Sequence, residues 1–293
     1  MNEIELLRRI ARKVPAAGRG LLLGIGDDCA VFRSQGAKED LLFTTDMMLE
    51  NVHFRRETHP AESVGWKALA RGLSDIAAMG GEPRFCLLSL AVPEWADQRW
   101  IDAFYRGFLR LARKTGTALA GGDLGRTERM SCDVVVCGAA PCGKALRRDG
   151  ARPGDSIYVS GPLGGAAMGL ETRTGAAWKK HSRPDPRLEF GLRLRGLASA
   201  AIDLSDGLSL DVHRLCLASG CAAVLDGPIP AFPGATVEQA LHGGEDYELL
   251  FTARKAVAGA TRIGSIRKGR PGRVEFEGKP LKPLGYDHFT RGL

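Results

Sequence analysis

Short apolar runs and stretches of helical period alternate along the first half of the chain. Residues 21–45 contain two or three short apolar runs separated by glycine and polar residues, which predicts strands. Residues 61–80 change to a 3.6-residue period, which predicts a helix that ends at Gly80. Residues 1–14 have the same helical spacing, with acidic residues before basic ones, and predict a further helix.

The pattern continues through the rest of this half. We expect a strand at 85–92, a helix at 97–114, a buried strand at 117–123 and another strand at 132–140. The segment that follows, 141–155, is rich in glycine, proline and charge. It predicts the junction between two domains, 1–140 and 141–293.

The second half opens with a strand at 156–161 and a glycine-rich turn into a short helix that ends near residue 170. A polar, basic stretch follows at 171–187. Beyond it the pattern predicts a helix, a strand at 200–205, a helix at 207–218, a strand at 221–225, a helix near 234–241, a strand at 247–253 and a final β-like segment. Because both halves mix strands and helices, the expected fold class is α+β in two domains.

Composition narrows the class of protein. The chain has 293 residues, of which 44% are hydrophobic and 26% charged, and no run of 18 to 20 apolar residues could span a bilayer. The first residues lack the apolar core of a signal peptide, so we expect a cytoplasmic protein without a membrane partner. The seven cysteines show no metal-binding spacing and are expected to be reduced core thiols. The net charge of +7 is scattered, which favours a solvated surface over a nucleic-acid site, with acidic small molecules as the second reading.

Six acidic motifs at the ends of apolar segments carry the candidate chemistry. They are GDD (26–28), TTD (44–46), LSD (73–75), GGD (121–123), DLSDG (203–207) and GGED (243–246). A carboxylate beside buried strands loses hydration at a cost of several kcal/mol unless a cation compensates it. None of the six motifs contains Lys or Arg, so a hard cation such as Mg²⁺ would supply the charge.

Glycines and hydroxyl groups accompany these acids, and they indicate phosphate as a second ligand. Glycine lets backbone N–H groups approach phosphate oxygens. The chain nevertheless has no P-loop motif and no protein-kinase motif set. Each acidic motif alone is more often a turn or a helix cap, but six of them together favour one shared site for metal and phosphate.

The motifs also resemble, in order, those of the thiamine-monophosphate kinase family, within the superfamily of aminoimidazole ribonucleotide synthetase and selenophosphate synthetase. They are GIGDDCAVF, TTDMMLENVHF, WKALARGLSDIAAMGGEP, LAGGDLGR, AIDLSDGL, GGEDYELLFT and GYDHF. The resemblance implies ATP-dependent phosphorylation of thiamine monophosphate to thiamine diphosphate, the last step of thiamine diphosphate biosynthesis. It also implies a homodimer joined through the N-terminal sheet, a C-terminal α/β domain, and ATP phosphates that face the cleft between the domains.

The resemblance assigns roles to individual residues. The Mg²⁺ ligands would be Asp28, Thr44, Thr45, Asp46, Asp75, Asp123, Asp203 and Asp206, with the direct role of Asp27 left open. The ATP contacts would be Tyr105, Gly122, Arg148 and Ser205. The substrate contacts would be His53, Glu245 and Tyr286, the last as an aromatic wall for the thiazolium cation, a contact worth about 0.5 to 2 kcal/mol. From local pattern alone, half-buried packing explains Tyr105 better than a ligand contact does, and C-terminal packing explains Tyr286 equally well. His53 is also compatible with a structural role and Arg148 with a surface base.

The implied chemistry needs no catalytic base. The nucleophile would be a phosphate oxygen whose second pKa is about 6, so that it is mostly ionised at pH 7. Several Mg²⁺ ions would neutralise two phosphate groups and hold them in line, and transfer would be direct, without a phosphoenzyme.

Two other classes of protein compete with this interpretation. A related ATP-dependent synthetase would keep the metal and phosphate site and change the acceptor, although no cysteine precedes residue 29 to act as the reactive residue of a selenophosphate synthetase. A nucleotide-dependent scaffold or nucleic-acid binder would bind without turnover and depend steeply on salt. Residues 171–187 form a segment short for the family, and no role is assigned there.

Overall fold

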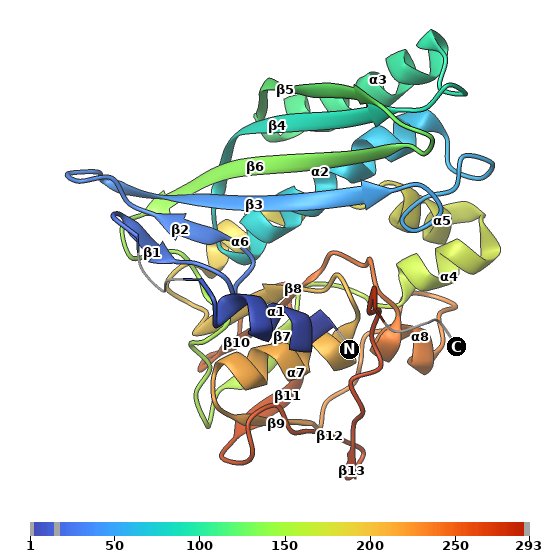
Figure 1. Cartoon of the computed structure of the whole chain (residues 1–293). Helices are drawn as coiled ribbons and strands as arrows, with labels where there is room; N and C mark the ends of the chain where they lie inside the picture. Colours follow the sequence, from blue (N-terminus) through green and yellow to red (C-terminus); the bar gives the residue numbers. More distant parts are fainter. Residues whose placement is uncertain (1–2, 15–17, 290–293) are drawn as a thin grey trace.

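The computed structural model describes residues 3–14 and 18–289, and two mixed sheets with their helices form its two layers (Figure 1). The first sheet has the strand order β1-β2-β3-β6-β4-β5 and is antiparallel except for the β4–β5 pair. Its strands are β1 (Leu21–Leu23), β2 (Ala30–Phe32), β3 (Glu39–Leu49), β4 (Glu82–Val92), β5 (Ala118–Arg126) and β6 (Ser131–Pro141). The predicted strands of this half are therefore all present.

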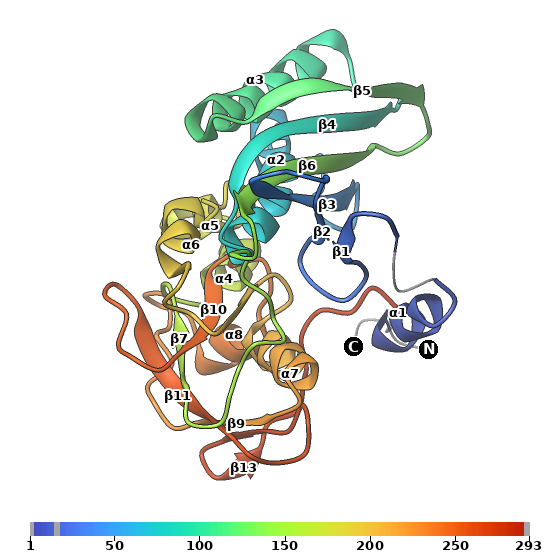
Figure 2. The ribbon, with the colours of Figure 1, turned by 90° about the vertical axis from the view of Figure 1, so that its left-hand side faces the viewer.

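Helices α2 (Ala61–Ala78) and α3 (Gln98–Thr115) cover one face of the first sheet, whereas the other face carries no helix among the described residues (Figure 2). The two helices cross closely because glycines meet there. A Cβ added at Gly107 would lie 1.7 Å from the Glu62 carbonyl oxygen, and one at Gly65 would lie 1.9 Å from that of Phe104. Asp97 caps α3 by accepting a 2.8 Å hydrogen bond from the Trp100 N–H.

Strand β5 differs from the prediction of a buried strand at 117–123. It is the edge strand of the sheet, paired only with β4, and most of its residues are exposed. Glycines and the charged Asp123 are compatible with this exposed position, because an edge strand has a neighbouring strand on one side only.

The second sheet has the order β13-β12-β9-β11-β7-β10-β8 and is antiparallel except for the β12–β9 pair. Its strands are β7 (Ser156–Val159), β8 (Ala200–Asp203), β9 (Ala222–Leu225), β10 (Leu249–Ala253), β11 (Thr261–Arg267), β12 (Val274–Phe276) and β13 (Lys279–Pro280). The helices of this half are α4 (Gly165–Thr172), α5 (Gly175–Ser182), α6 (Leu188–Leu194), α7 (Leu208–Ala218) and α8 (Val237–His242). The polar stretch 171–187 thus contains a helix, α5, whose Ala177, His181 and Ser182 are buried.

Three clusters of buried apolar residues form the core, and one of them joins the two halves. It brings Ala77 and Ala78 of α2 together with Leu194 of α6 and Phe251 of β10. The last strand of the first sheet ends at Pro141, and the first strand of the second sheet begins at Ser156. The domain boundary near residue 140 stays a prediction. All seven cysteines are free, and six are buried, as expected for reduced core thiols.

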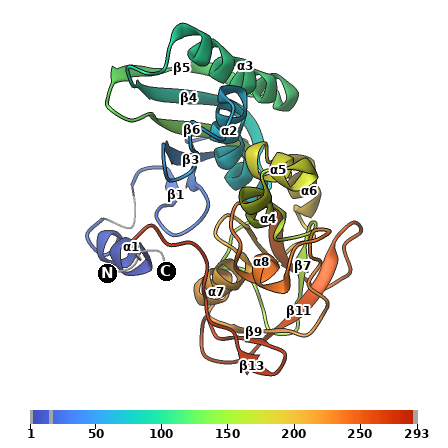
Figure 3. The same ribbon diagram turned by 90° about the vertical axis from the view of Figure 1, so that its right-hand side faces the viewer.

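Helix α1 (Glu3–Ala11) lies beside the C-terminal segment, near the space between the two layers (Figures 2 and 3). None of the helices in the described ranges has both the length and the apolar character needed to cross a membrane.

Candidate active site

A cavity of about 860 Å³ lies between the two halves of the chain. Elements far apart in the sequence line it, namely α1, β3, α2, α4, the loops after β8 and α8, and the C-terminal segment. Eight of the predicted site residues are among its lining residues: Asp46, His53, Asp75, Asp203, Ser205, Asp206, Glu245 and Tyr286.

Three carboxylates meet beside this cavity. Asp28 follows β1, Asp75 lies in the last turns of α2, and Asp203 ends β8. One oxygen of each lies within 4.8 Å of the others. Hydroxyl groups orient two of them, since Thr44 Oγ1 donates to Asp75 Oδ2 at 2.5 Å and Ser74 Oγ donates to Asp203 Oδ2 at 2.7 Å.

This carboxylate cluster is electrostatically unfavourable without a cation. Burial, and then the charge of neighbouring carboxylates, raises the pKa of Asp28 to about 6 and that of Asp203 to about 7. The same causes raise the pKa of Asp75 well above its usual range. Asp28 Oδ2 is also buried without a hydrogen-bond partner. An all-oxygen cluster with an unpaired buried carboxylate oxygen fits a hard divalent cation such as Mg²⁺.

Arginines distant in sequence pair with the acids. Arg148 Nη2 lies 2.7 Å from Asp28 Oδ1, and its Nε lies 3.3 Å from Asp27 Oδ1. Arg71 Nη2 lies 3.0 Å from Asp46 Oδ1, and Arg214 contacts Asp206. The six acidic motifs contain no Lys or Arg. Folding therefore brings in these arginines, which supply part of the positive charge that compensates the carboxylates.

Asp211 is a buried acid that the motif analysis missed. Its Oδ2 accepts hydrogen bonds from the N–H groups of Asp206 and Gly207, at 3.2 and 3.1 Å, and so caps the start of α7. Burial and the charge of Asp206 raise the pKa of Asp211 to about 7. An acidic residue in the first turn of the predicted helix at 207–218 was the available signal.

Glu245 also lines the cavity, with its backbone at φ 67° and its N–H donating to the Ser205 carbonyl oxygen at 2.7 Å. Its Oε1 lies 2.7 Å from Lys67 Nζ and its Oε2 lies 3.3 Å from His181 Nδ1. Burial is the largest single influence and alone would raise the pKa of Glu245, but Lys67, His181 and Arg71 together outweigh it and lower the pKa to about 2. Glu245 therefore presents a fixed negative charge to the cavity.

Aromatic rings stand next to this carboxylate. The ring centroids of His53 and His288 are 5.2 Å apart, and those of Tyr286 and His288 are 4.8 Å apart in an edge-to-face contact. Lys67 Nζ also donates to the His53 carbonyl oxygen at 3.1 Å. These rings and the charge of Glu245 suit a flat, cationic ligand.

Thr45, Gly122 and Asp123 lie apart from the carboxylate cluster in the single chain. Thr45 follows Thr44 on β3 and points to the other face of the sheet, where its Oγ1 donates to Asp133 Oδ1 at 2.7 Å. Gly122 and Asp123 are on β5, three strands away from β3. A Cβ at Gly122 would lie 1.8 Å from the Leu88 carbonyl oxygen, so this position accepts only glycine.

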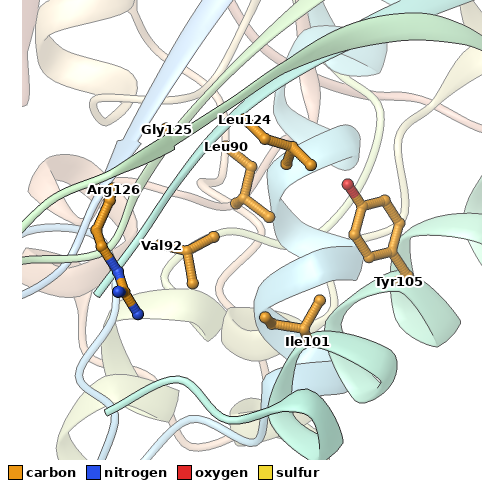
Figure 4. Close-up of a pocket in the computed structure, with 7 residues that line it drawn as sticks. All are labelled: Leu90, Val92, Ile101, Tyr105, Leu124, Gly125 and Arg126. Atoms are coloured by element: carbon orange, nitrogen blue, oxygen red, sulfur yellow. The ribbon is translucent and has the colours of Figure 1, made fainter. Parts of the chain in front are cut away.

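Tyr105 lines a second, smaller pocket of about 420 Å³ between α3 and the β4–β5 edge (Figure 4). Leu90, Val92, Ile101 and Leu124 form its apolar wall, and Arg126 closes one side. This pocket is separate from the large cavity and shares none of its lining residues.

Lys67 and Arg71 are functional candidates that the motif analysis also missed. Together with Asp75 they form a series with a spacing of four residues along α2. That spacing places three charged side chains on one face of a helix that is otherwise largely buried. A charged series on an apolar helix was the signal in the sequence.

Comparison with known proteins identifies the family. Residues 26–143 match the family described as AIR synthase related protein, N-terminal domain. The thiamine-monophosphate kinase of Salmonella typhimurium is 37% identical, over 99% of this chain and 98% of that protein.

Solved structures agree with the sequence comparison. AaThiL complexed with AMPPCP and TMP is 32% identical, with a TM-score of 0.88 over 98% of this chain and 97% of the other. The thiamine-monophosphate kinase of Stenotrophomonas maltophilia is 38% identical, with a TM-score of 0.77 over 94% and 96%. The chain therefore belongs to the thiamine-monophosphate kinase family.

Proposed function

We propose that this chain is a kinase that transfers the γ-phosphate of ATP to thiamine monophosphate and releases thiamine diphosphate and ADP. Its relatives are named thiamine-monophosphate kinases, and AaThiL was solved with AMPPCP and TMP. One observation in the structure carries the proposal. A single cavity is lined both by Asp75 and Asp203 of the carboxylate cluster and by the negatively charged Glu245 and the aromatic Tyr286.

Mg²⁺ is the cation that we propose for the carboxylate cluster, held by Asp28, Asp75 and Asp203 and supported by Asp46 and Asp206 at the same cavity. When bound, the metal supplies positive charge that offsets the repulsion between two phosphate groups. Thr44 and Ser74 hold the ligand oxygens of Asp75 and Asp203 in place through their hydroxyl groups.

The residues of the cavity bind and orient the substrates, and none of them is needed as a base. The attacking oxygen belongs to a phosphate that is already ionised at pH 7. Arg148 and Ser205 are proposed contacts of the nucleotide, and Tyr105 and Gly122 are proposed contacts at the β5 edge. We expect direct transfer, so a phosphorylated Asp or His trapped during turnover would contradict the mechanism.

The activity test uses purified protein with Mg-ATP and thiamine monophosphate. We expect ADP and thiamine diphosphate to form in equal amounts, with neither formed when free thiamine replaces the monophosphate. Thiamine diphosphate is measured by its fluorescence after oxidation to the thiochrome. Absence of product with the monophosphate, at several Mg²⁺ concentrations, would contradict the proposal.

We propose further that the chain forms a homodimer through the uncovered face of the first sheet and the β5 edge. Apolar side chains on the uncovered face support this, because Met47 is 56% and Leu87 38% exposed. Thr45 and Asp123, which are predicted metal ligands, lie on this same face and not with the carboxylate cluster. A second copy would cover both groups.

Sedimentation velocity tests the dimer. We expect the wild-type chain to sediment as a dimer and Leu87→Glu to sediment as a monomer. The reason is that a second copy would bury the face on which Leu87 lies, and burying the Glu charge there is costly. Leu197→Glu is the matched control, since Leu197 is 57% exposed and lies on the loop before β8 in the other half of the chain. A wild-type monomer at micromolar concentration would contradict this arrangement.

A further inference from the structure

Arg71 holds a distinctive place in the large cavity. Lys67, Arg71 and Asp75 follow one another at intervals of four residues on the same face of α2. Lys67 contacts Glu245, and Asp75 belongs to the carboxylate cluster. Arg71 therefore lies between these two contacts along α2, about one helical turn from each. A ligand that touched both Glu245 and the carboxylate cluster would pass beside it.

Charge makes this position significant. The lining contains the carboxylates of Asp46, Asp75, Asp203, Asp206 and Glu245. Arg71 is the only Arg or Lys among the described residues that line the cavity. Burial, and then the charge of Arg71, lowers the pKa of His53 to about 3. Burial, and then the charge of Lys67, lowers the pKa of His181 to about 3. Both rings are therefore neutral at pH 7. The guanidinium is thus the fixed positive charge that the protein itself presents to an entering dianion.

The hydrogen bonding of Arg71 leaves capacity for a ligand. Its side chain is 13% exposed, its Nη2 contacts Asp46 Oδ1 at 3.0 Å, and its Nε is buried without a hydrogen-bond partner. A guanidinium has five N–H donors, and a phosphate can accept two of them side by side. One donor can therefore stay on Asp46 while others turn to the ligand.

From this geometry we infer that Arg71 binds the phosphate of the acceptor and sets the preference for thiamine monophosphate over unphosphorylated thiamine. The inference rests on the proposed kinase function and adds a specificity residue to its site. Arg71 also joins this phosphate to Asp46, a predicted metal ligand, through one guanidinium.

Calorimetric binding tests the inference without turnover. With Mg²⁺ present and ATP absent, we expect Arg71→Met to raise the Kd for thiamine monophosphate roughly 10- to 100-fold, the usual range for a lost charge-assisted hydrogen bond. The Kd for thiamine should stay unchanged, because thiamine has no phosphate. Arg71→Lys keeps the charge without the two-pronged geometry, so we expect an intermediate Kd.

Arg195→Met is the matched control. Arg195 is similarly buried, with 18% of its side chain exposed, and it pairs with Glu82 at 2.9 Å outside the cavity. We expect no change in either Kd for this variant. Thermal melting checks that each variant is folded, and if Arg71→Met does not fold, Arg71→Gln replaces it.

The possible results separate the two proposals. A wild-type protein that binds thiamine as tightly as thiamine monophosphate would contradict the kinase function itself. A wild-type protein that prefers the monophosphate, together with an Arg71→Met variant that keeps the same preference, would overturn only the role of Arg71. A variant that changes Mg²⁺ affinity alone would show that Arg71 acts on Asp46 and not on the acceptor.

Discussion

Individual residues of the candidate site show what a sequence motif can and cannot reveal. The motifs selected Asp28, Asp75 and Asp203, and the fold brings these three carboxylates together. Their role as metal ligands stays a prediction. The partners of these acids were not predictable. Arg148 reaches Asp28 across 120 residues of sequence, and only the tertiary fold brings the two together.

The separation of Thr44 and Thr45, in contrast, could be predicted from the sequence, because it follows from local strand geometry. Neighbouring residues of a strand point to opposite faces of the sheet, so these two could not both face one site in a single chain. Thr44 donates to Asp75, whereas Thr45 donates to Asp133 on the uncovered face. A count of side-chain directions along the expected strand would have distinguished them.

At this scale we predict opposite effects of Asp75→Asn on activity and on stability. Activity should fall roughly 100-fold or more, because the carboxylate cluster that we propose for Mg²⁺ loses a ligand. The metal-free protein should become more stable at pH 8, because the amide carries no charge that burial and the neighbouring carboxylates would disfavour, as they do at Asp75. Turnover assays and urea unfolding in EDTA measure the two effects, with the exposed Asp102→Asn of α3 as control. A metal-free variant less stable than the wild type would contradict the electrostatic description.

Helices and strands were predicted mainly by hydrophobic period, and the exceptions have physical reasons. The polar stretch 171–187 contains α5 because tertiary contacts bury a face that the sequence does not mark as apolar. His181 of α5 stacks on Trp178 at 5.3 Å and contacts His59 at 3.1 Å between ring nitrogens. The exposure of β5 also depends on its place at the sheet edge, which strand pattern alone does not determine.

Helix contact predicts the effect of Gly107→Ala. A methyl group there would overlap the Glu62 backbone carbonyl of α2, so the helices must separate. We expect a loss of about 3 kcal/mol in the free energy of unfolding, which exceeds the gain of about 1 kcal/mol in helix propensity. Urea denaturation measures the change. Gly125→Ala is the control, because its Cβ would meet open space, and equal stability of both variants would contradict the close crossing.

Across the whole molecule, the raised carboxylate pKa values make stability depend on pH. Asp28 titrates at about 6 and Asp203 and Asp211 at about 7 in the folded chain, against 3.8 for an unperturbed Asp. Through these carboxylates the folded state binds more protons than the unfolded state between about pH 4 and pH 7, so their contribution to stability falls as pH rises through this range. The lowered pKa values of His53, His59 and His181 act in the opposite direction below about pH 6.5. Burial is the main cause of the raised pKa values, and the gathering of acids from both halves at one place adds to it.

We accordingly predict that, in EDTA, the melting temperature decreases between pH 5 and pH 8. Added Mg²⁺ should raise it more at pH 8 than at pH 5, since a metal competes with protons for the same oxygens. Differential scanning fluorimetry over a series of pH values measures both effects. Asp75→Asn should reduce the decrease, whereas a melting temperature that rises with pH in EDTA would rule out the carboxylate cluster as the cause.

The core cluster that joins the two halves has a consequence for how the chain folds during synthesis. Ala77 and Ala78 of α2 are covered by Leu194 and Phe251, which leave the ribosome much later. The nascent first half must therefore expose this end of α2 until α6 and β10 of the second half are made. An exposed apolar surface of this kind is where a chaperone or a second nascent chain would bind.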